Sequence, residues 1–195
     1  MTTSLSLPLR CRTPERWAVA IAAAIDQFLP DHAACERKAA ATGMSFVARY
    51  PDRPELVAAM IAFAREELEH LQLVHKHMMQ RGLVLGPDEK DPYLGALRKR
   101  AASHGEARLC DHLLLAAVVE ARGCERFAML GEVLDDASLQ TLYRRLGVAE
   151  ARHAHLFVQL AERYFTKEDV QARLTAWLDM EAEIIAALPL RLALH

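Results

Sequence analysis

The stretches Glu67-Leu68-Glu69-His70 and Glu150-Ala151-Arg152-His153 are two copies of the pattern Glu-x-x-His. Residues three positions apart lie on one face of an α-helix, so each stretch can present a carboxylate and an imidazole to the same metal ion. One such tetrapeptide is expected by chance in a chain with this much glutamate and histidine. The surroundings of the two copies therefore decide whether they predict a metal site.

The first copy has a matching glutamate on the other side of a predicted turn. Glu36 precedes the turn at residues 51–54 by about as many positions as Glu67 follows it. At a helical rise of 1.5 Å per residue, both glutamates lie roughly 22–24 Å from the turn. Glu36 and Glu67 are therefore expected at the same level of a helical hairpin.

The second copy repeats this arrangement. Glu120 and Glu150 flank the turn at Asp135-Asp136 by roughly 15 residues each, which puts both about 21–23 Å from it. Four glutamates and two histidines are thus expected in one layer of a four-helix protein.

A buried layer of four carboxylates needs protons or cations to be stable. Four carboxylates and two imidazoles can hold two divalent ions, and donors without thiolates suit iron or manganese better than zinc or copper(I). The alternative is that these glutamates lie on solvated helix faces. We predict a non-haem di-iron centre with the ligands Glu36, Glu67, His70, Glu120, Glu150 and His153.

Turn and helix-breaking residues divide the rest of the chain into helices. We expect them over about 13–28, 30–50, 54–81, 94–101, 106–134, 137–164 and 166–188, with Thr13 capping the first. Two hairpins with short turns, joined by a long connection between Gly82 and Gly105, are the plan of a ferritin-like bundle. The predicted fold is a single all-α domain over 1–195, a ferritin-like four-helix bundle with a long crossover and additional N- and C-terminal helices.

The composition agrees with this fold and narrows the possible partners. With 52% hydrophobic and only 6% aromatic residues, the chain resembles helical rather than β-rich proteins. The net charge of -2 predicts no general attraction to nucleic acid or membranes, and no segment has the length and apolarity of a membrane span. Four cysteines without a C-x-x-C pair indicate a reducing cytoplasm.

Several residues near the predicted ligands have an open role. Glu125 lies about 140° around its helix from Glu120 and is the alternative ligand at that position. Cys124 is expected to face inward as a small core residue. Phe127 is either a core residue or part of an apolar substrate pocket. The candidates for accepting a hydrogen bond from a ligand histidine are Asp26, Asp31 and Asp111.

Segments along nearly the whole chain resemble the tRNA 2-methylthio-N6-isopentenyladenosine hydroxylase family. The most specific is Glu120-Ala121-Arg122-Gly123-Cys124-Glu125-Arg126-Phe127. The others are 35–40, 66–70, 81–82, 91–93 and 150–153. One departure is Ala154, where an aromatic residue is expected.

This resemblance implies an O2-dependent hydroxylation of the isopentenyl group on a modified adenosine beside the tRNA anticodon. It implies two iron ions as cofactor, O2 as co-substrate, and no catalytic residues beyond the metal ligands. Two electrons would come from an external donor, because the sequence has no haem, flavin or rubredoxin-like motif. The expected partner is the tRNA anticodon loop.

Basic residues suggest where the RNA could bind. Arg98-Lys99-Arg100 is the densest basic stretch, and Arg144-Arg145 is a smaller one. Either could contact phosphates, or could simply be an exposed charged face.

The main alternative function is iron storage or ferroxidation of the ferritin or bacterioferritin type, which can use the same ligand pattern. The additional first and last helices and the 120–127 segment favour the hydroxylase. A manganese catalase also remains possible on the ligands alone.

Overall fold

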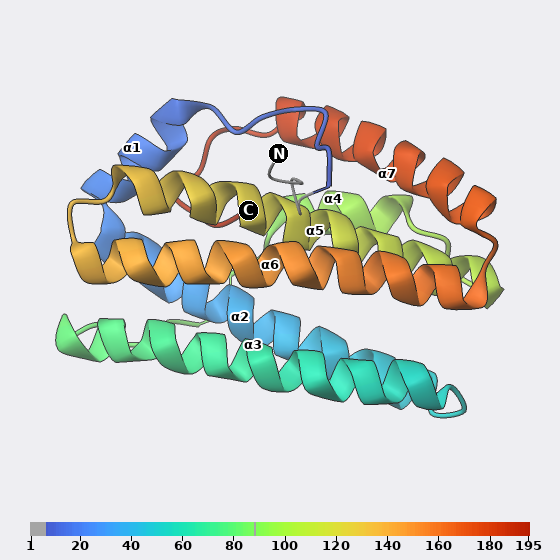
Figure 1. Ribbon diagram of the computed structural model, residues 1–195. Coiled ribbons are helices and arrows are strands. Elements are labelled where there is room, and N and C mark those ends of the chain that lie inside the picture. Colours follow the sequence, from blue (N-terminus) through green and yellow to red (C-terminus); the bar gives the residue numbers. More distant parts are fainter. Residues whose placement is uncertain (1–6, 88) are drawn as a thin grey trace, which may run out of the picture. The chain divides into compact units, whose positions relative to one another are not determined.

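The computed structural model describes residues 7–87 and 89–195. Within those residues there are seven helices and no strand, which confirms the predicted all-α class. The helices are α1 (Glu15–Ala23), α2 (Ile25–Arg49), α3 (Pro54–Gln80), α4 (Pro92–Arg100), α5 (Gly105–Val133), α6 (Ala137–Tyr164) and α7 (Lys167–Ala187) (Figure 1). No helix in these ranges is both long and apolar enough to cross a membrane.

The chain divides into two compact units. Residues 23–89 and 192–194 make the α2–α3 unit, and the rest of the described chain makes the unit that contains α4, α5, α6 and α7, here the α4–α7 unit. Each unit contains one of the two predicted helical hairpins.

In the α2–α3 unit the two helices pack side by side and antiparallel (Figure 1). They approach most closely at Gly43, where a Cβ atom would lie 3.0 Å from the Phe63 ring and 3.1 Å from the Met60 carbonyl oxygen. Apolar side chains such as Leu56 and Met60 fill the interface and are fully buried. Buried and exposed positions follow the helical period along both helices, so one face of each helix is buried.

The break between the first two helices lies earlier than predicted. The sequence predicts a first helix to about residue 28 and a break at Pro30, but α1 ends at Ala23 and Pro30 lies inside α2. Ala24, with φ −130° and ψ 36°, makes the break. Pro30 sits in the second turn of α2, where its missing N–H removes one helical hydrogen bond. Burial of the neighbouring Phe28 and Leu29 offsets that loss.

In the α4–α7 unit, α5 and α6 form the second antiparallel hairpin, and α7 packs against α4, α5 and α6 (Figure 1). Side-chain caps start three of these helices; α6 and α7 begin close to their predicted starts, and α4 begins at Pro92, two residues before the predicted 94. Asp91 accepts from the backbone N–H groups of Tyr93 and Leu94, Asp136 caps α6, and the Thr166 hydroxyl accepts from the N–H of Asp169. The short helix α4 therefore has a fixed start within the long crossover.

Candidate metal centre

The α2–α3 unit brings three of the predicted ligands together. Glu36 comes from α2, and Glu67 and His70 come from one face of α3, because they are three residues apart. All three are buried, and each has a ligand atom within 4.8 Å of the others'. The Nδ1 atom of His70 lies 3.7 Å from Glu36 Oε2 and 3.6 Å from Glu67 Oε2. We call these three residues the α2–α3 triad.

A fourth residue of the α2–α3 unit, His32, was not predicted from the sequence. It is fully buried one turn before Glu36, and its Nε2 lies 2.6 Å from Glu36 Oε1. A carboxylate only accepts hydrogen bonds, so His32 donates here and fixes the orientation of Glu36. The His32-x-x-x-Glu36 spacing, four residues on one helix face, is the signal that could have identified it.

These contacts determine the charges of the triad. Burial alone would raise the pKa of Glu36, but the hydrogen bond from His32 and the neighbouring His70 imidazole outweigh it and hold that pKa well below its usual value. Burial would lower the pKa of His70, yet the Glu36 and Glu67 carboxylates raise it to about 9. The two carboxylates thus stabilise positive charge at the position of the imidazole.

The α4–α7 unit contains the corresponding set, here the α5–α6 triad. Glu120 comes from α5, and Glu150 and His153 come from α6. The Nδ1 atom of His153 lies 3.7 Å from Glu120 Oε2 and 3.9 Å from Glu150 Oε2, and all three side chains are buried. Gly123, one turn after Glu120, leaves room beside Glu150, whose Cγ lies 3.6 Å from the position a Cβ would take.

Both triads have the donor set that fits a hard or borderline divalent metal. Each consists of two carboxylates and one imidazole, converging within 4.8 Å and shielded from water. Oxygen and nitrogen donors without thiolate suit iron or manganese. Two carboxylates buried together carry a large desolvation penalty, which a bound divalent cation offsets.

The opposite side of α5 carries a buried charge network that the sequence analysis missed. Arg122 is fully buried, and its Nε and Nη2 atoms each donate to one oxygen of Glu181 on α7 at 2.9 Å. It also donates to the Cys11 carbonyl oxygen at 2.8 Å and to the Thr13 hydroxyl at 3.2 Å. Tyr93 of α4 donates to the same Glu181 at 3.2 Å. We call Arg122, Glu125, Glu181, Thr13 and Tyr93 the Arg122 network.

Glu125 belongs to this network. The Thr13 hydroxyl donates to Glu125 at 2.7 Å, and Arg122 forms an ion pair with it. Glu125, the alternative to Glu120, thus contacts the N-terminal segment, and the Thr13 hydroxyl expected to cap the first helix is bonded to Glu125. The 120–127 segment therefore has two faces: Glu120 lies in the α5–α6 triad, and Arg122 and Glu125 bind the surrounding segments.

The three aspartates considered as partners of a ligand histidine have other contacts. Asp26 forms an ion pair with Arg81 at 2.9 Å, and Asp31 accepts from the Leu194 N–H at 2.7 Å. Asp111 accepts from Arg173 at 2.5 and 2.7 Å, from the Ala102 N–H at 2.7 Å and from Trp177 at 3.2 Å. Asp111 therefore joins the end of the crossover to α5 and α7.

The structure also shows where the other residues lie whose role the sequence leaves open. Phe127 is 1% exposed and packs against Tyr143 with ring centroids 5.5 Å apart, as expected of a core residue. Cys124 is half-buried. The basic stretch Arg98, Lys99 and Arg100 forms the exposed last turn of α4.

Comparisons with known proteins agree with this arrangement. The family model described as tRNA-(MS2IO6A)-hydroxylase (MiaE) matches residues 1–195. The tRNA 2-(methylsulfanyl)-N(6)-isopentenyladenosine(37) hydroxylase of Pseudomonas putida is 36% identical over 187 residues, covering 96% of this chain and 91% of that protein. The enzyme of the same name from Salmonella typhimurium is 29% identical over 228 residues, covering 91% and 83%.

A solved structure also matches nearly the whole chain. It is titled protein 43 with aldehyde deformylating oxygenase activity, from Synechococcus. It shares 34% sequence identity and a TM-score of 0.89, and the match covers 94% of this chain and 92% of that one. This match confirms the predicted ferritin-like fold.

Proposed function

Because the chain belongs to the tRNA-(MS2IO6A)-hydroxylase (MiaE) family, we propose that it is an O2-dependent di-iron monooxygenase acting on tRNA. Its substrate is the isopentenyl group of 2-methylthio-N6-isopentenyladenosine beside the anticodon. The observation that supports this beyond family membership is the buried Glu, Glu, His triad in each unit. An iron-dependent oxygenase needs such oxygen and nitrogen donors.

The two triads together form one di-iron centre, and the two units act as one domain. The ligands are those predicted from the sequence: Glu36, Glu67, His70, Glu120, Glu150 and His153. Two observations support this assignment of the ligands: the two triads have the same donor set, and the ligand glutamates of each hairpin lie at matched distances from its turn. When bound, the two irons supply the O2 chemistry that oxidises an allylic C–H bond, which no protein side chain can do unaided.

The residues of this chain bind and orient the centre. The carboxylates neutralise the cations, and the buried surroundings exclude water from the ligands. His32 keeps the Glu36 carboxylate in one orientation.

The remaining partners follow from the chemistry. The reaction consumes two electrons, which an external donor delivers. The tRNA anticodon loop is the macromolecular substrate, with Arg98, Lys99 and Arg100 as candidate contacts. A tRNA substrate and four cysteines that form no disulfide support a cytoplasmic location.

A second candidate function comes from the Synechococcus structure, whose title reports aldehyde deformylating oxygenase activity. At 34% identity over most of both chains, that likeness is comparable with the likeness to the tRNA hydroxylases. Aldehyde deformylation is therefore the activity to test beside tRNA hydroxylation. Family membership favours tRNA hydroxylation over iron storage, and the Synechococcus structure is the reason to test deformylation.

The test is to incubate the iron-loaded protein with O2, a reductant and tRNA from cells that lack this protein. Nucleosides are then analysed by mass spectrometry, and we expect the isopentenylated adenosine to gain one oxygen. Glu120→Ala should abolish the gain, while Glu132→Ala, an exposed change on the same helix, should not. The same preparations receive an aldehyde in place of tRNA. Release of formate without oxygen gain on tRNA would replace the proposed function by deformylation.

A further inference from the structure

A pocket of about 520 Å³ lies between α4 and α7, and none of its lining residues belongs to either triad. The residues that matter here are Lys90, Gly95, Ala96, Lys99, Arg100 and Ile184, and we call their surface the α4–α7 pocket. Its volume is within the range of about 300–1,000 Å³ that is usual for small-molecule sites. The pocket is more open than enclosed, so it can cover one face of a base while the rest of a nucleotide stays outside it.

The floor of this pocket is small and apolar. Gly95 and Ala96 are consecutive residues of α4, and a Cβ atom at Gly95 would meet nothing within 4 Å. Ile184 of α7 supplies the facing apolar wall. A flat, uncharged ring can therefore approach the α4 backbone closely.

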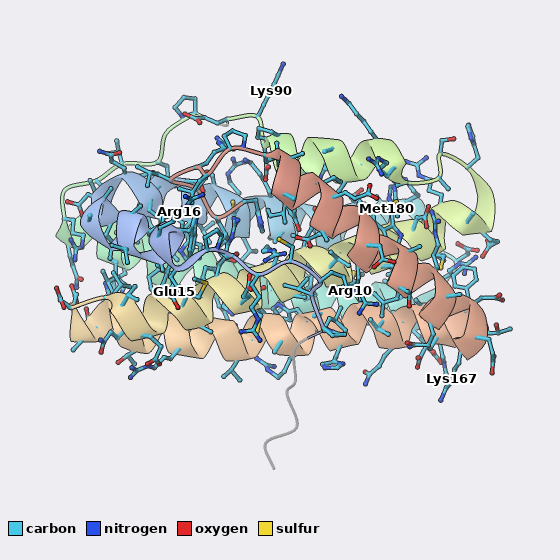
Figure 2. The ribbon with its side chains drawn as sticks, turned by 90° about the horizontal axis from the view of Figure 1, so that it is seen from above. Arg10, Glu15, Arg16, Lys90, Lys167 and Met180 are labelled. Carbon is cyan, nitrogen blue, oxygen red and sulfur yellow. The ribbon has the colours of Figure 1, made fainter. Side chains whose placement is uncertain are left out.

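The rim of the pocket is positively charged. Lys90, Lys99 and Arg100 line it, and Figure 2 shows the Lys90 side chain reaching outward. The one acidic residue in the lining, Asp91, is engaged in capping α4. This excess of positive charge stands out in a chain with a net charge of -2.

One residue of the rim has an acidic neighbour, but this neighbour does not prevent it from binding a phosphate. Arg100 lies 3.4 Å from Glu183, and their side chains are 47% and 68% exposed. Exposed ion pairs of this kind are weak, so a phosphate can compete with Glu183 for the guanidinium.

We propose, on the basis of the proposed function, that the α4–α7 pocket binds one unpaired nucleotide of the tRNA anticodon loop. The base lies on Gly95 and Ala96 against Ile184, and the flanking phosphates contact Lys90, Lys99 and Arg100. Loops of RNA are recognised through unstacked bases, and Lys and Arg bind their phosphates. The apolar floor fits the base of a nucleotide, and the cationic rim fits its phosphates.

The experiment measures the contributions of the apolar floor and of the charged rim to RNA binding separately. The affinity of a fluorescent anticodon stem-loop is measured by anisotropy at several salt concentrations. We expect Lys99→Gln/Arg100→Gln to weaken binding and to reduce the slope of log K against log salt by about 1.4, two lost phosphate contacts at about 0.7 each. Gly95→Leu fills the pocket without changing its charge. It should weaken binding about tenfold and leave the slope unchanged.

Two matched controls accompany these variants. Arg65→Gln/Lys76→Gln removes the same charge from exposed positions of α3 and should leave the affinity unchanged. Gly95→Ala adds only the methyl group for which the structure has space, and it should bind like the wild type. Circular dichroism and iron stoichiometry verify that Gly95→Leu is folded and loaded.

The outcomes distinguish this inference from the proposed function. Wild-type affinity and an unchanged KM for tRNA in Gly95→Leu would overturn the pocket, although hydroxylation itself stands. An equal loss in the α3 control would show general attraction to RNA and would also overturn the pocket. Failure of the wild type to hydroxylate any tRNA would overturn the proposed function first.

Discussion

At the scale of single residues, the His32–Glu36 hydrogen bond is the contact on which a proposed metal ligand depends most directly. Its 2.6 Å distance and complete burial leave Glu36 little freedom to turn. His32 also stacks on Phe28, with ring centroids 5.7 Å apart, which fixes the imidazole itself. Metal affinity is sensitive to residues of this kind because they determine where the ligand oxygen points.

We expect His32→Leu to weaken iron binding about 10–100-fold, the usual effect of losing such a partner. Ferrous iron would be titrated against a competing chelator under anaerobic conditions. His75→Leu, on α3, is the matched control and should retain the wild-type affinity. Equal affinities in His32→Leu and the wild type would show that Glu36 does not need this hydrogen bond.

At the scale of elements, buried charges join segments that are far apart in the sequence. The Arg122 network joins α5 to α7, to α4 and to the N-terminal segment. Asp111 joins α5 to the end of the crossover and to α7. Both sets surround α5, the helix that carries Glu120, so they determine how this helix sits in the α4–α7 unit.

Arg122→Met should destabilise the protein by about 3 kcal/mol, because it leaves Glu181 buried without its main partner. Replacing both residues, as in Arg122→Met/Glu181→Leu, should restore part of the lost free energy of unfolding, because Glu181 is then no longer buried without its partner, although Glu125 still loses its ion pair and Tyr93 its acceptor. Urea unfolding followed by circular dichroism measures both. A double variant as unstable as the single one would contradict this account of the network.

Asp111→Asn should cost about 2 kcal/mol at neutral pH through its weakened bond to Arg173. Burial would raise the pKa of Asp111, but the donors from Arg173, Ala102 and Trp177 lower it below its usual value. Asp111 therefore stabilises the folded state fully above its unfolded pKa of about 3.9, and this contribution disappears as the pH falls through the folded value.

The measurement is urea unfolding of Asp111→Asn and the wild type at pH 7, 5 and 3.5. The difference in unfolding free energy should be the same at pH 7 and 5 and smaller at pH 3.5. Asp135→Asn, an exposed change in the α5–α6 turn, should show no such difference. A difference that grows on acidification would refute the predicted role of Asp111.

At the scale of the whole molecule, local signals in the sequence predict most of the helices. Gly82 and Asp135-Asp136 mark helix ends closely, and α7 begins at Lys167, next to the predicted start at 166. Pro30 misled the prediction because burial around it outweighs one lost hydrogen bond. The Arg122 network was missed for another reason: Glu181 lies 59 positions from Arg122, and no periodicity relates residues so far apart.

Local periodicity also accounts for the part of the proposed metal centre that the sequence predicts. Ligand pairs on one helix follow from 3.6-residue periodicity, and the hairpin turns give the level of their partners. Each triad could therefore be predicted within its own hairpin. That the two triads act together is a proposal for the whole molecule, and it has a thermodynamic consequence.

If the triads form one centre, iron should stabilise the wild type, and loss of a ligand in either unit should abolish the effect. A ligand that binds only the folded state raises the free energy of unfolding by RT ln(1 + [L]/Kd), or about 2.7 kcal/mol at 100-fold excess over Kd. Glu67→Ala and Glu150→Ala remove one ligand from each triad. The effect of iron is measured within each variant, so any change that the substitution makes to the stability of the iron-free protein does not enter the comparison.

Thermal unfolding with and without ferrous iron, under argon, measures these increments. We expect iron to raise the unfolding midpoint of the wild type and to leave the midpoint of either variant unchanged. Glu132→Ala should keep the full increment, because that residue lies on the surface. An increment of half the wild-type size in both variants would mean that each triad binds its own ion independently. The joint centre would then be wrong, while metal binding by each triad would stand.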